Sequence, residues 1–302
     1  MRSHLFKKPR MVGIAIHEDE IRLLCLSKAK NIAMIEHYVV RKVRPEWVVG
    51  GRFHNSEKIA DVIKGFVEQE GLDQSAAAIA FPMAQVVTKY ISLPAYLSWA
   101  ESKTEIRENL SYYLSASSDE LYADVIQLGA RSDKENEFLV IAARRAMIRE
   151  YMTVVARSCL TLQVIDIDFY AITRAVGYVR CATPTYIVID VDDSQAKMIF
   201  VCQHKIIHHQ LCQAVSFCEQ LLFALHRIKK TNDSFAGDTV FISGNQSRVA
   251  SIKEAIQAKL AMNIEVIDPL HHVKLSSGVA SETVHSSSIL TVLGLALRQH
   301  DG

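Results

Sequence analysis

The sequence has no surplus of charge of either sign, because 34 lysine and arginine residues stand against 33 aspartate and glutamate residues in 302. A protein whose main partner is nucleic acid normally carries an excess of cations that neutralise phosphates. Nucleic acid is therefore not expected as the main partner. Hydrophobic residues make up 49% of the chain and charged residues 22%, which excludes extended disorder and predicts a buried core.

Motifs that would place the chain outside the cytoplasm, or among well-known enzymes, are also missing. The six cysteines form no Cys-x-x-Cys pair and no disulfide framework, which favours a reducing compartment. No apolar run reaches the roughly 18 residues of a membrane-spanning helix, and the basic start MRSHLFKKPR precedes no signal-peptide core. No Gly-x-Ser-x-Gly elbow, Walker A loop or His-Glu-x-x-His run occurs. These absences predict a soluble, cytoplasmic protein.

The hydrophobic pattern predicts one order of secondary structure that occurs twice. The first occurrence uses strands at 11–17, 20–28 and 31–40, a helix capped by Ser56 and ending at Gly71, a strand at 76–81, a helix at 144–159, a strand at 162–167 and a helix at 169–179. The second uses strands at 185–191, 195–202 and 205–210, a helix at 213–230, a strand at 239–243, a helix at 247–260, a strand at 264–267 and a helix at 289–298. Both read βββαβαβα, the plan of the actin, Hsp70 and sugar-kinase folds. The expected fold class is α/β with duplicated actin-like or RNase H-like halves.

The first half follows this order only if residues 85–143 are an insertion. The inserted segment predicts a small α+β subdomain, composed of a strand at 86–92 stopped by Pro94, a helix at 103–115 and strands at 121–131 and 138–143. The predicted division of the chain is 10–83 and 144–182 for the two parts of the first half, 84–143 for the inserted subdomain and 183–302 for the second half.

Several segments, taken together, resemble those of one family in order and spacing. They are FPMAQVVTKYISLP (81–94), ENLSYYLSASSDELYADVIQLG (108–129), FLVIAARRAMIREYMTVVARSCLTLQVIDIDFYAITRA (138–175) with Asp166 before its helix, TVFISGNQSRVASIKEAIQ (239–257), VIDP (266–269) and LGLALR (293–298). The chain resembles FtsA and, more closely, PilM, the cytoplasmic actin-like component of type IV pilus assembly. The resemblance runs from about Met11 to Arg298.

The resemblance implies a nucleotide cleft between two hairpin turns, and the first turn departs from the family pattern. Such turns need glycine and small hydroxyl residues around the phosphates and an aspartate for the metal. Where the family has Asp-x-Gly-Ser-Ser-Ser-x-Lys, this chain has AIHEDEIR (15–22), with three adjacent carboxylates and with Arg22 at the place of the lysine. Two like charges about 4 Å apart repel by roughly 4 kcal/mol at an effective dielectric constant of about 20. A bound metal could offset this repulsion, but a solvated hairpin tip is the favoured interpretation.

The second and third nucleotide elements are altered as well. Asp190 keeps the family aspartate, while Asp192 replaces the glycine and is followed by Asp193 and Ser194. A remnant metal site formed by Asp190 with Asp192 is one interpretation, and an ordinary polar hairpin is the favoured one. If nucleotide binds, the resemblance implies Mg-ATP and the ligands Arg22, Asp190, Ser194, Ser243 and Gly244. Gly244 also suits a strand-to-helix turn for structural reasons alone. Otherwise no cofactor, metal or catalytic residue is expected.

His208, His209, Cys212 and Cys218 have the side chains of metal ligands. Because neighbouring residues on a strand point to opposite faces, His208 and His209 cannot easily share one ion. Core or surface positions are the favoured interpretation.

The resemblance also implies a partner, since the PilM family binds the short cytoplasmic N-terminal segment of the inner-membrane protein PilN in a groove between the first core subdomain and the insertion. An apolar peptide needs a concave, partly aromatic surface and often a strand edge. Tyr90, Tyr112, Tyr113 and Tyr122 are the candidate contacts, although each suits core packing or a plain surface position equally well.

The predicted function is a type IV pilus assembly scaffold that is not an enzyme and that lies at the inner membrane only through its PilN-like partner. Other pilus assembly components are further candidate partners. The main alternative is an actin-like ATPase or nucleotide-gated switch with a metal held by Asp190. A sugar kinase is a third, weaker possibility, which the altered phosphate turns oppose.

Overall fold

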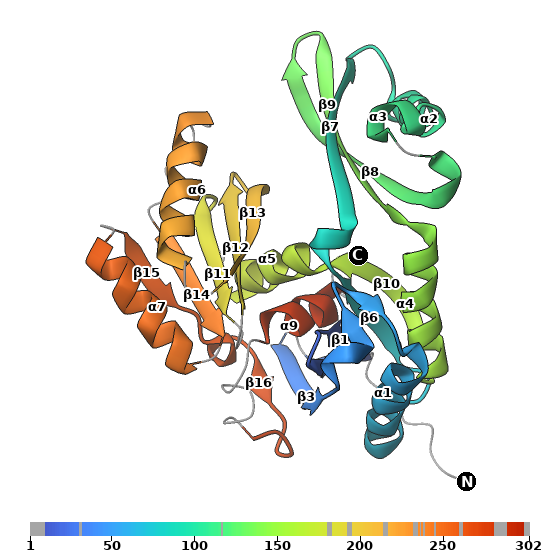
Figure 1. Cartoon of the computed structure of the whole chain (residues 1–302), viewed down its shortest axis with the longest axis vertical. Helices are drawn as coiled ribbons and strands as arrows, with labels where there is room; N and C mark the ends of the chain where they lie inside the picture. Colours follow the sequence, from blue (N-terminus) through green and yellow to red (C-terminus); the bar gives the residue numbers. More distant parts are fainter. Residues whose placement is uncertain are drawn as a thin grey trace.

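The computed structural model describes residues 10–29, 32–115, 117–179, 183–191, 195–213, 217–231, 235, 237, 239–244, 246–259, 262–280 and 289–298. Within these ranges the strands form a six-stranded, a five-stranded, a three-stranded and a two-stranded sheet. The two larger sheets stand beside each other with helices between and outside them, and the three-stranded sheet projects from one end (Figure 1). The α/β class with duplicated halves is confirmed.

The first large sheet has the strand order β10-β6-β1-β2-β3-β16. An antiparallel meander of β1, β2 and β3 lies at its centre, and β6 and β10 extend it in parallel. The strands are β1 (Arg10–Ile16), β2 (Glu20–Ala29), β3 (Ile32–Lys42), β6 (Ala76–Phe81), β10 (Thr161–Ile167) and β16 (Lys274–Leu275). One face packs on the helices α1 (Ser56–Glu70) and α4 (Arg145–Arg157) through residues such as Ile14, Ile63 and Val154.

The second large sheet has the order β13-β12-β11-β14-β15. Its strands are β11 (Tyr186–Val191), β12 (Gln195–Cys202), β13 (Lys205–Gln213), β14 (Thr239–Gly244) and β15 (Asn263–Val266). The helices α6 (Phe217–Thr231) and α7 (Gln246–Lys259) cover its outer face, where Phe200, Leu221 and Ile256 are buried together. Strand, helix and strand alternate here as they do in the first sheet.

Two helices lie between the large sheets and form a shared core. They are α5 (Asp168–Val179) and α9 (Leu290–Leu297), which end the two halves, and their apolar side chains pack with residues from the inner faces of both sheets. Glycine makes this packing close: a Cβ atom on Gly294 would lie 1.8 Å from the carbonyl oxygen of Ala171, and one on Gly13 would lie 2.2 Å from that of Val292. Helix α9 therefore touches α5 and β1 backbone to backbone.

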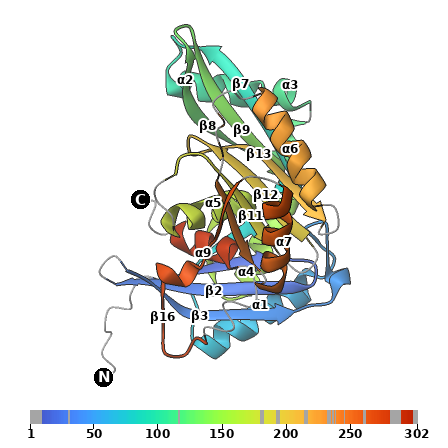
Figure 2. The same cartoon turned by 90° about the vertical axis from the view of Figure 1, so that its left-hand side faces the viewer.

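The three-stranded sheet comes from the segment between β6 and α4. Its order is β7-β9-β8, with both pairs antiparallel, so that β7 and β8 are its edges. Its elements are β7 (Val86–Pro94), α2 (Trp99–Glu108), α3 (Leu110–Leu114), the 3-10 turn η3 (Ser118–Glu120), β8 (Leu121–Ser132) and β9 (Glu135–Arg144). The helices α2 and α3 cover one face around Ile106 and Phe138. Figure 2 shows this unit extending beyond the two large sheets.

Several element boundaries differ from the prediction for local reasons. The cap of α1 is Asn55 rather than Ser56, because the Asn55 side chain accepts a hydrogen bond from the Lys58 N–H at 3.2 Å. The helix expected at 103–115 begins at Trp99, where Ser98 and Glu101 form a reciprocal capping box, and it breaks into α2 and α3 at Asn109. The helix expected from residue 213 begins at Phe217, since β13 continues to Gln213.

The segment after β15 was not expected to hold a strand. After the 3-10 turn η5 (Pro269–His271), β16 pairs in parallel with β3, with Lys274 opposite Met34 and Leu275 opposite Ile35. A segment of the predicted second half thus extends the sheet of the first half. The predicted division at 83/84, 143/144 and 182/183 stays a prediction. Within the described ranges, no helix combines the length and apolarity needed to cross a lipid bilayer.

Candidate functional site

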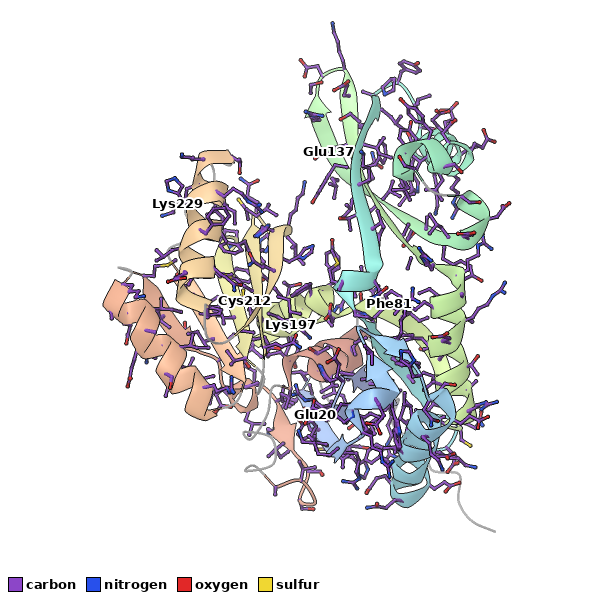
Figure 3. All side chains as sticks on the ribbon, in the orientation of Figure 1. Glu20, Phe81, Glu137, Lys197, Cys212 and Lys229 are labelled. Carbon is purple, nitrogen blue, oxygen red and sulfur yellow. The ribbon has the colours of Figure 1, made fainter. Side chains whose placement is uncertain are left out.

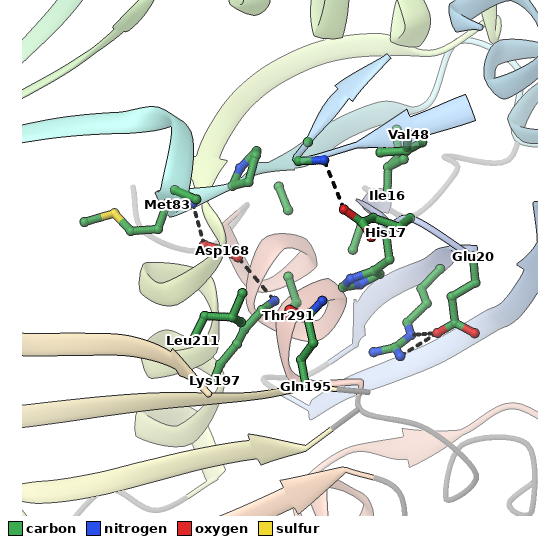
Figure 4. Close-up of a pocket in the computed structure, with 18 of the residues that line it drawn as sticks. Ile16, His17, Glu20, Val48, Met83, Asp168, Gln195, Lys197, Leu211 and Thr291 are labelled. Carbon is green, nitrogen blue, oxygen red and sulfur yellow. Dashed lines mark hydrogen bonds and ion pairs between the residues drawn. The ribbon is translucent and has the colours of Figure 1, made fainter. Parts of the chain in front are cut away.

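A cavity of about 490 Å³ lies between the two large sheets, at the β1–β2 turn. Its walls come from both halves: the β1–β2 turn, the segment around the two-stranded hairpin of β4 (Val48–Val49) and β5 (Arg52–Phe53), the connection that follows β6, the start of α5, β12, β13 and α9. Figure 4 shows Asp168, Lys197, Gln195 and Thr291 around its centre. This is the place where the sequence predicts a nucleotide cleft.

The three carboxylates of the β1–β2 turn are each bonded to a neighbour. Glu20 is only 6% exposed and accepts a hydrogen bond of 2.6 Å from the Arg22 Nε atom. Lys42 Nζ lies 2.8 Å from Glu20 and 3.0 Å from Asp19, and the hydrogen bond to Glu20 is the main cause of a raised Lys42 pKa. Glu18 accepts the Gly50 N–H at 3.0 Å. The expected solvated tip is therefore wrong for Glu20, because its side chain is buried and paired with Arg22 and Lys42.

An ion pair spans the cavity and joins the two halves. Lys197 Nζ on β12 lies 3.2 Å from Asp168 Oδ2 at the first residue of α5, and both side chains are nearly buried. The other oxygen of Asp168 accepts the N–H groups of Met83 at 3.1 Å and of Phe169 at 2.9 Å. Asp168 therefore contacts the segment after β6 through Met83, the first turn of α5 through Phe169 and the second sheet through Lys197 (Figure 4).

The sequence analysis does not predict either residue of this ion pair, although two features of the sequence point to them. Lys197 is a lone cation inside the apolar run of β12, and a buried charge needs a partner. Asp168 follows the carboxyl end of β10 and opens α5, which is the common place for functional side chains in α/β sheets and a favourable one for a carboxylate.

The other predicted nucleotide ligands do not converge on the cavity in the described part of the chain. Asp190 is 1% exposed and faces Lys197 and Ser243 as register partners in the second sheet. Gly244 has a φ of +123°, and a Cβ atom there would lie 1.9 Å from the Val191 carbonyl oxygen, so the structural reason for this glycine holds. Ser194, Asp192 and Asp193 lie outside the described residues. Of the predicted set, Arg22 alone is among the described residues that line the cavity.

His208 and His209 face opposite sides of β13, as the alternation of strand side chains requires. The ring of His208 lies 5.6 Å from that of Phe200, and the ring of His209 lies 5.0 Å from that of Phe169. Within the described ranges no three histidine, cysteine or acidic side chains form a metal-binding group.

Burial of His209 makes the stability of the fold depend on pH in a predictable direction. It lowers the His209 pKa from the ordinary value of 6.5, and the Asp168 charge opposes this only in part. Because the unfolded chain takes up a proton that folded His209 resists, we expect stability to fall as the pH drops below about 6.5. A His209→Phe variant should lose less stability between about pH 7 and pH 5, measured by urea unfolding. An unchanged slope relative to the parent protein would contradict this origin.

The four candidate tyrosines divide between two sides of the three-stranded sheet. Leu121 of β8 and Ile91 of β7 pack under α2 and α3, so their neighbours Tyr122 and Tyr90 lie on the opposite, open face. The Tyr90 hydroxyl donates to the Ile206 carbonyl of β13 at 3.5 Å.

The remaining two tyrosines, Tyr112 and Tyr113, are on α3, with ring centroids 5.5 Å apart. One continuous groove cannot contain all four rings, which a reading of sequence positions alone could not reveal.

Tyr122 marks the border between the three-stranded sheet and the first half. The guanidinium of Arg145, at the start of α4, stacks 4.7 Å from the Tyr122 ring centroid, and its Nε donates to the Leu121 carbonyl at 2.8 Å. Tyr122 is still 42% exposed. An exposed aromatic ring held by a cation beside an edge strand is a suitable contact for an apolar peptide.

The duplicated βββαβαβα order around a cleft defines a protein of the actin-like ATPase fold. Comparison with solved structures supports this fold. A structure described as the PilM–PilN type IV pilus biogenesis complex matches with a TM-score of 0.78 at 16% identity, covering 95% of this chain and 98% of that one. The ethanolamine utilization protein EutJ from Carboxydothermus hydrogenoformans matches with a TM-score of 0.54 at 12% identity, covering 97% and 90%.

The family follows from a direct sequence match. The chain belongs to the type IV pilus assembly protein PilM family, whose family model matches residues 13–210. The resemblance drawn from the sequence motifs is confirmed.

Proposed function

We propose that the protein is a scaffold of type IV pilus assembly that binds the cytoplasmic N-terminal segment of a PilN-like inner-membrane protein. The observation that carries this proposal is membership of the PilM family, together with the shape shared along nearly the whole chain with the structure described as the PilM–PilN complex. The protein would then lie at the inner membrane through its partner, with no bilayer-spanning segment of its own required.

The chemistry of the cavity supports binding rather than nucleotide turnover. Among the described lining residues, four carboxylates (Glu18, Asp19, Glu20 and Asp168) accompany two cations, Arg22 and Lys197, and each cation is already bonded to a carboxylate. A triphosphate would have to break these pairs and approach the carboxylates, both of which cost free energy. We therefore propose that nucleotide binding is weak or lost.

The partner segment is proposed to lie where the three-stranded sheet meets the first half. Tyr122, stacked on Arg145, lies at this border, and the outer edges of β7 and β8 have no strand neighbour in the described part of the chain. A peptide that pairs with such an edge gains main-chain hydrogen bonds, while an aromatic pocket selects its apolar side chains.

Tyr122→Ala is expected to weaken binding of a peptide that copies the partner's N-terminal segment by about tenfold, from an affinity in the micromolar range. The reason is the loss of the exposed ring and of its stacking with Arg145. Isothermal titration calorimetry measures this change. Tyr112→Ala is the matched control, because Tyr112 is 82% exposed on α3 and contacts Tyr113 rather than the border. If the Tyr112 variant lost as much affinity as the Tyr122 variant, the assignment to the border would be wrong.

Deletion of residues 85–143 is expected to abolish peptide binding, since it removes both edges and Tyr122. The cut ends, Ala84 and Arg144, can be rejoined because they flank Val86 and Ala143, which are register partners on neighbouring strands about 5 Å apart. Circular dichroism would show whether the two large sheets still fold. Full peptide affinity in a folded deletion variant would refute this location of the groove.

A nucleotide-gated switch is the second candidate, and one observation favours it. The Thr291 hydroxyl on α9 is buried, lines the cavity and has no hydrogen-bond partner among the residues that the structure describes. A buried unpaired hydroxyl in a cavity of this size suits a small polar ligand. Saturable binding of Mg-ATP would support this function over the scaffold.

A further inference from the structure

Helix α6 presents an outer face that nothing in the proposed function uses. Its inner face is buried on the second sheet through Phe217, Leu221, Ala224, Leu225 and Ile228. Figures 1 and 2 show α6 running along the flank of the molecule, with its other face turned outward. Both apolar and basic side chains are exposed there.

The apolar part of this face is concentrated in one turn. Phe223 is 70% exposed and Leu222 is also exposed beside it. Scattered exposed apolar residues are common on soluble proteins, so this pair is informative only together with the charged residues beside it. A single pair of apolar side chains is too small for a stable protein interface, which normally buries about 800 Å² on each partner.

The basic part follows within the next two turns. One stripe of the helix starts at Phe223 and continues with His226, Arg227 and Lys230, which follow it by three, four and seven residues. Lys229 follows Leu222 by seven residues and therefore lies on the same side of the helix as Leu222. All of these side chains are exposed. Figure 3 shows Lys229 on the outer flank of α6, far from the cavity that holds Lys197.

None of these cations forms an ion pair in the described part of the chain, and the one carboxylate of α6, Glu219, lies about two turns before Arg227. The contact found for Arg227 is with the His208 ring at 3.1 Å, and no ion pair involves Lys229 or Lys230. The chain as a whole carries a formal charge of only +1, so this end of α6 is a local feature rather than part of a generally basic surface. The positive electrostatic potential of this end of α6 is therefore confined to one flank of the molecule.

We propose that this face, defined by Leu222, Phe223, Arg227, Lys229 and Lys230 and called the α6 patch, docks on an anionic lipid surface. Charge complementarity selects the lipid headgroups, and the two apolar tips reach the boundary between headgroups and acyl chains. The remaining apolar residues of α6 stay in the protein core, so the contact is shallow and reversible. Because stable anchoring of a peripheral protein takes two weak signals, the α6 patch would act together with a membrane-bound partner.

Flotation of the full-length protein with lipid vesicles tests this assignment. At low ionic strength, the protein is expected to float with vesicles of phosphatidylglycerol and phosphatidylcholine in equal amounts, and not with pure phosphatidylcholine. The double variant Lys229→Glu with Lys230→Glu should reduce this partitioning by at least about tenfold, and Phe223→Ser should reduce it to a smaller extent. Circular dichroism and binding of the partner peptide would show that the variants remain folded, independently of lipid binding.

The matched control reverses two lysines elsewhere, Lys58 and Lys64 on α1, to glutamate; they lie 3.9 Å from Asp61 and 3.6 Å from Glu68. The same change of net charge at this site is expected to leave flotation near the parent level. Equal loss in the α1 and α6 variants, or equal flotation of the parent protein with anionic and neutral vesicles, would overturn the proposal. So would binding of an acidic protein segment by the α6 patch in the absence of any vesicle binding.

Discussion

Replacing Gly294 by alanine is expected to destabilise the protein by about 3 kcal/mol or more. The added Cβ atom would lie 1.8 Å from the Ala171 carbonyl oxygen and 2.5 Å from its carbon, so the backbone of α5 or α9 must move. These helices form the core shared by both halves, and a shift there disturbs packing on both sheets. Chemical denaturation monitored by circular dichroism measures the loss.

The matched control is Gly177→Ala on α5, the same helix that Gly294 touches. A Cβ atom on Gly177 meets nothing within 4 Å. Because alanine favours helix more than glycine does, this variant should be neutral or more stable by up to about 1 kcal/mol. Similar stabilities for the Gly294 and Gly177 variants would show that the close approach of α9 to α5 is not the constraint described above.

Replacing Asp168 by alanine is expected to cost about 3 kcal/mol of unfolding free energy. The change removes the carboxylate that lies 3.2 Å from Lys197 Nζ in a nearly buried place, and it removes the acceptor of the Met83 and Phe169 N–H groups. It also takes a carboxylate from the first turn of α5, where it is favourable. Urea unfolding of the variant measures this loss.

Lys197→Met should be less harmful than Asp168→Ala, because Asp168 keeps its two backbone hydrogen bonds. In the double variant, the apolar methionine no longer requires a countercharge, so part of the Asp168→Ala loss should be recovered. Strictly additive losses in this double-mutant cycle would mean that the ion pair across the cavity contributes nothing as a pair.

Much of the fold could be predicted because each element buries one face with a regular period. The β1 to β3 meander, the α1 stripe that includes Ile59, Ile63 and Phe66, and the repetition of this order in the second half all follow from such periods. The two-residue strand β16 is too short to show a period, and its pairing with β3 depends on how the halves dock. The Asn55 cap shows that the choice between neighbouring polar residues depends on local backbone geometry.

The candidate site was less predictable, because its residues meet only through tertiary structure. Glu20 and Arg22 stand two residues apart on a strand and therefore share a face, so their pairing could have been read from the sequence. The pairing of Asp168 with Lys197 could not, because it requires two separate sheets to face each other. The division of the four tyrosines required the register of β7, β9 and β8, which sets which residues lie under α2 and α3.

Under the proposed scaffold function, the bonds around the cavity would maintain an actin-like fold without the chemistry of a nucleotide site. The carboxylates that would repel phosphate form ion pairs within the protein. Glu20 pairs with Arg22 and Lys42, and Asp168 of the first half pairs with Lys197 of the second. Of these pairs, Asp168–Lys197 connects the first half with the second sheet, while the Glu20 pairs hold the β2 and β3 strands of the first sheet together. A scaffold needs this fixed shape more than it needs a hinge driven by a ligand.

The most direct test of the scaffold function is a pair of calorimetric titrations of the full-length protein, one with the partner's N-terminal peptide and one with Mg-ATP. We expect saturable heat from the peptide with a Kd in the micromolar range, and none from Mg-ATP at concentrations up to about a millimolar. Saturable binding of Mg-ATP together with no heat from the peptide would contradict it.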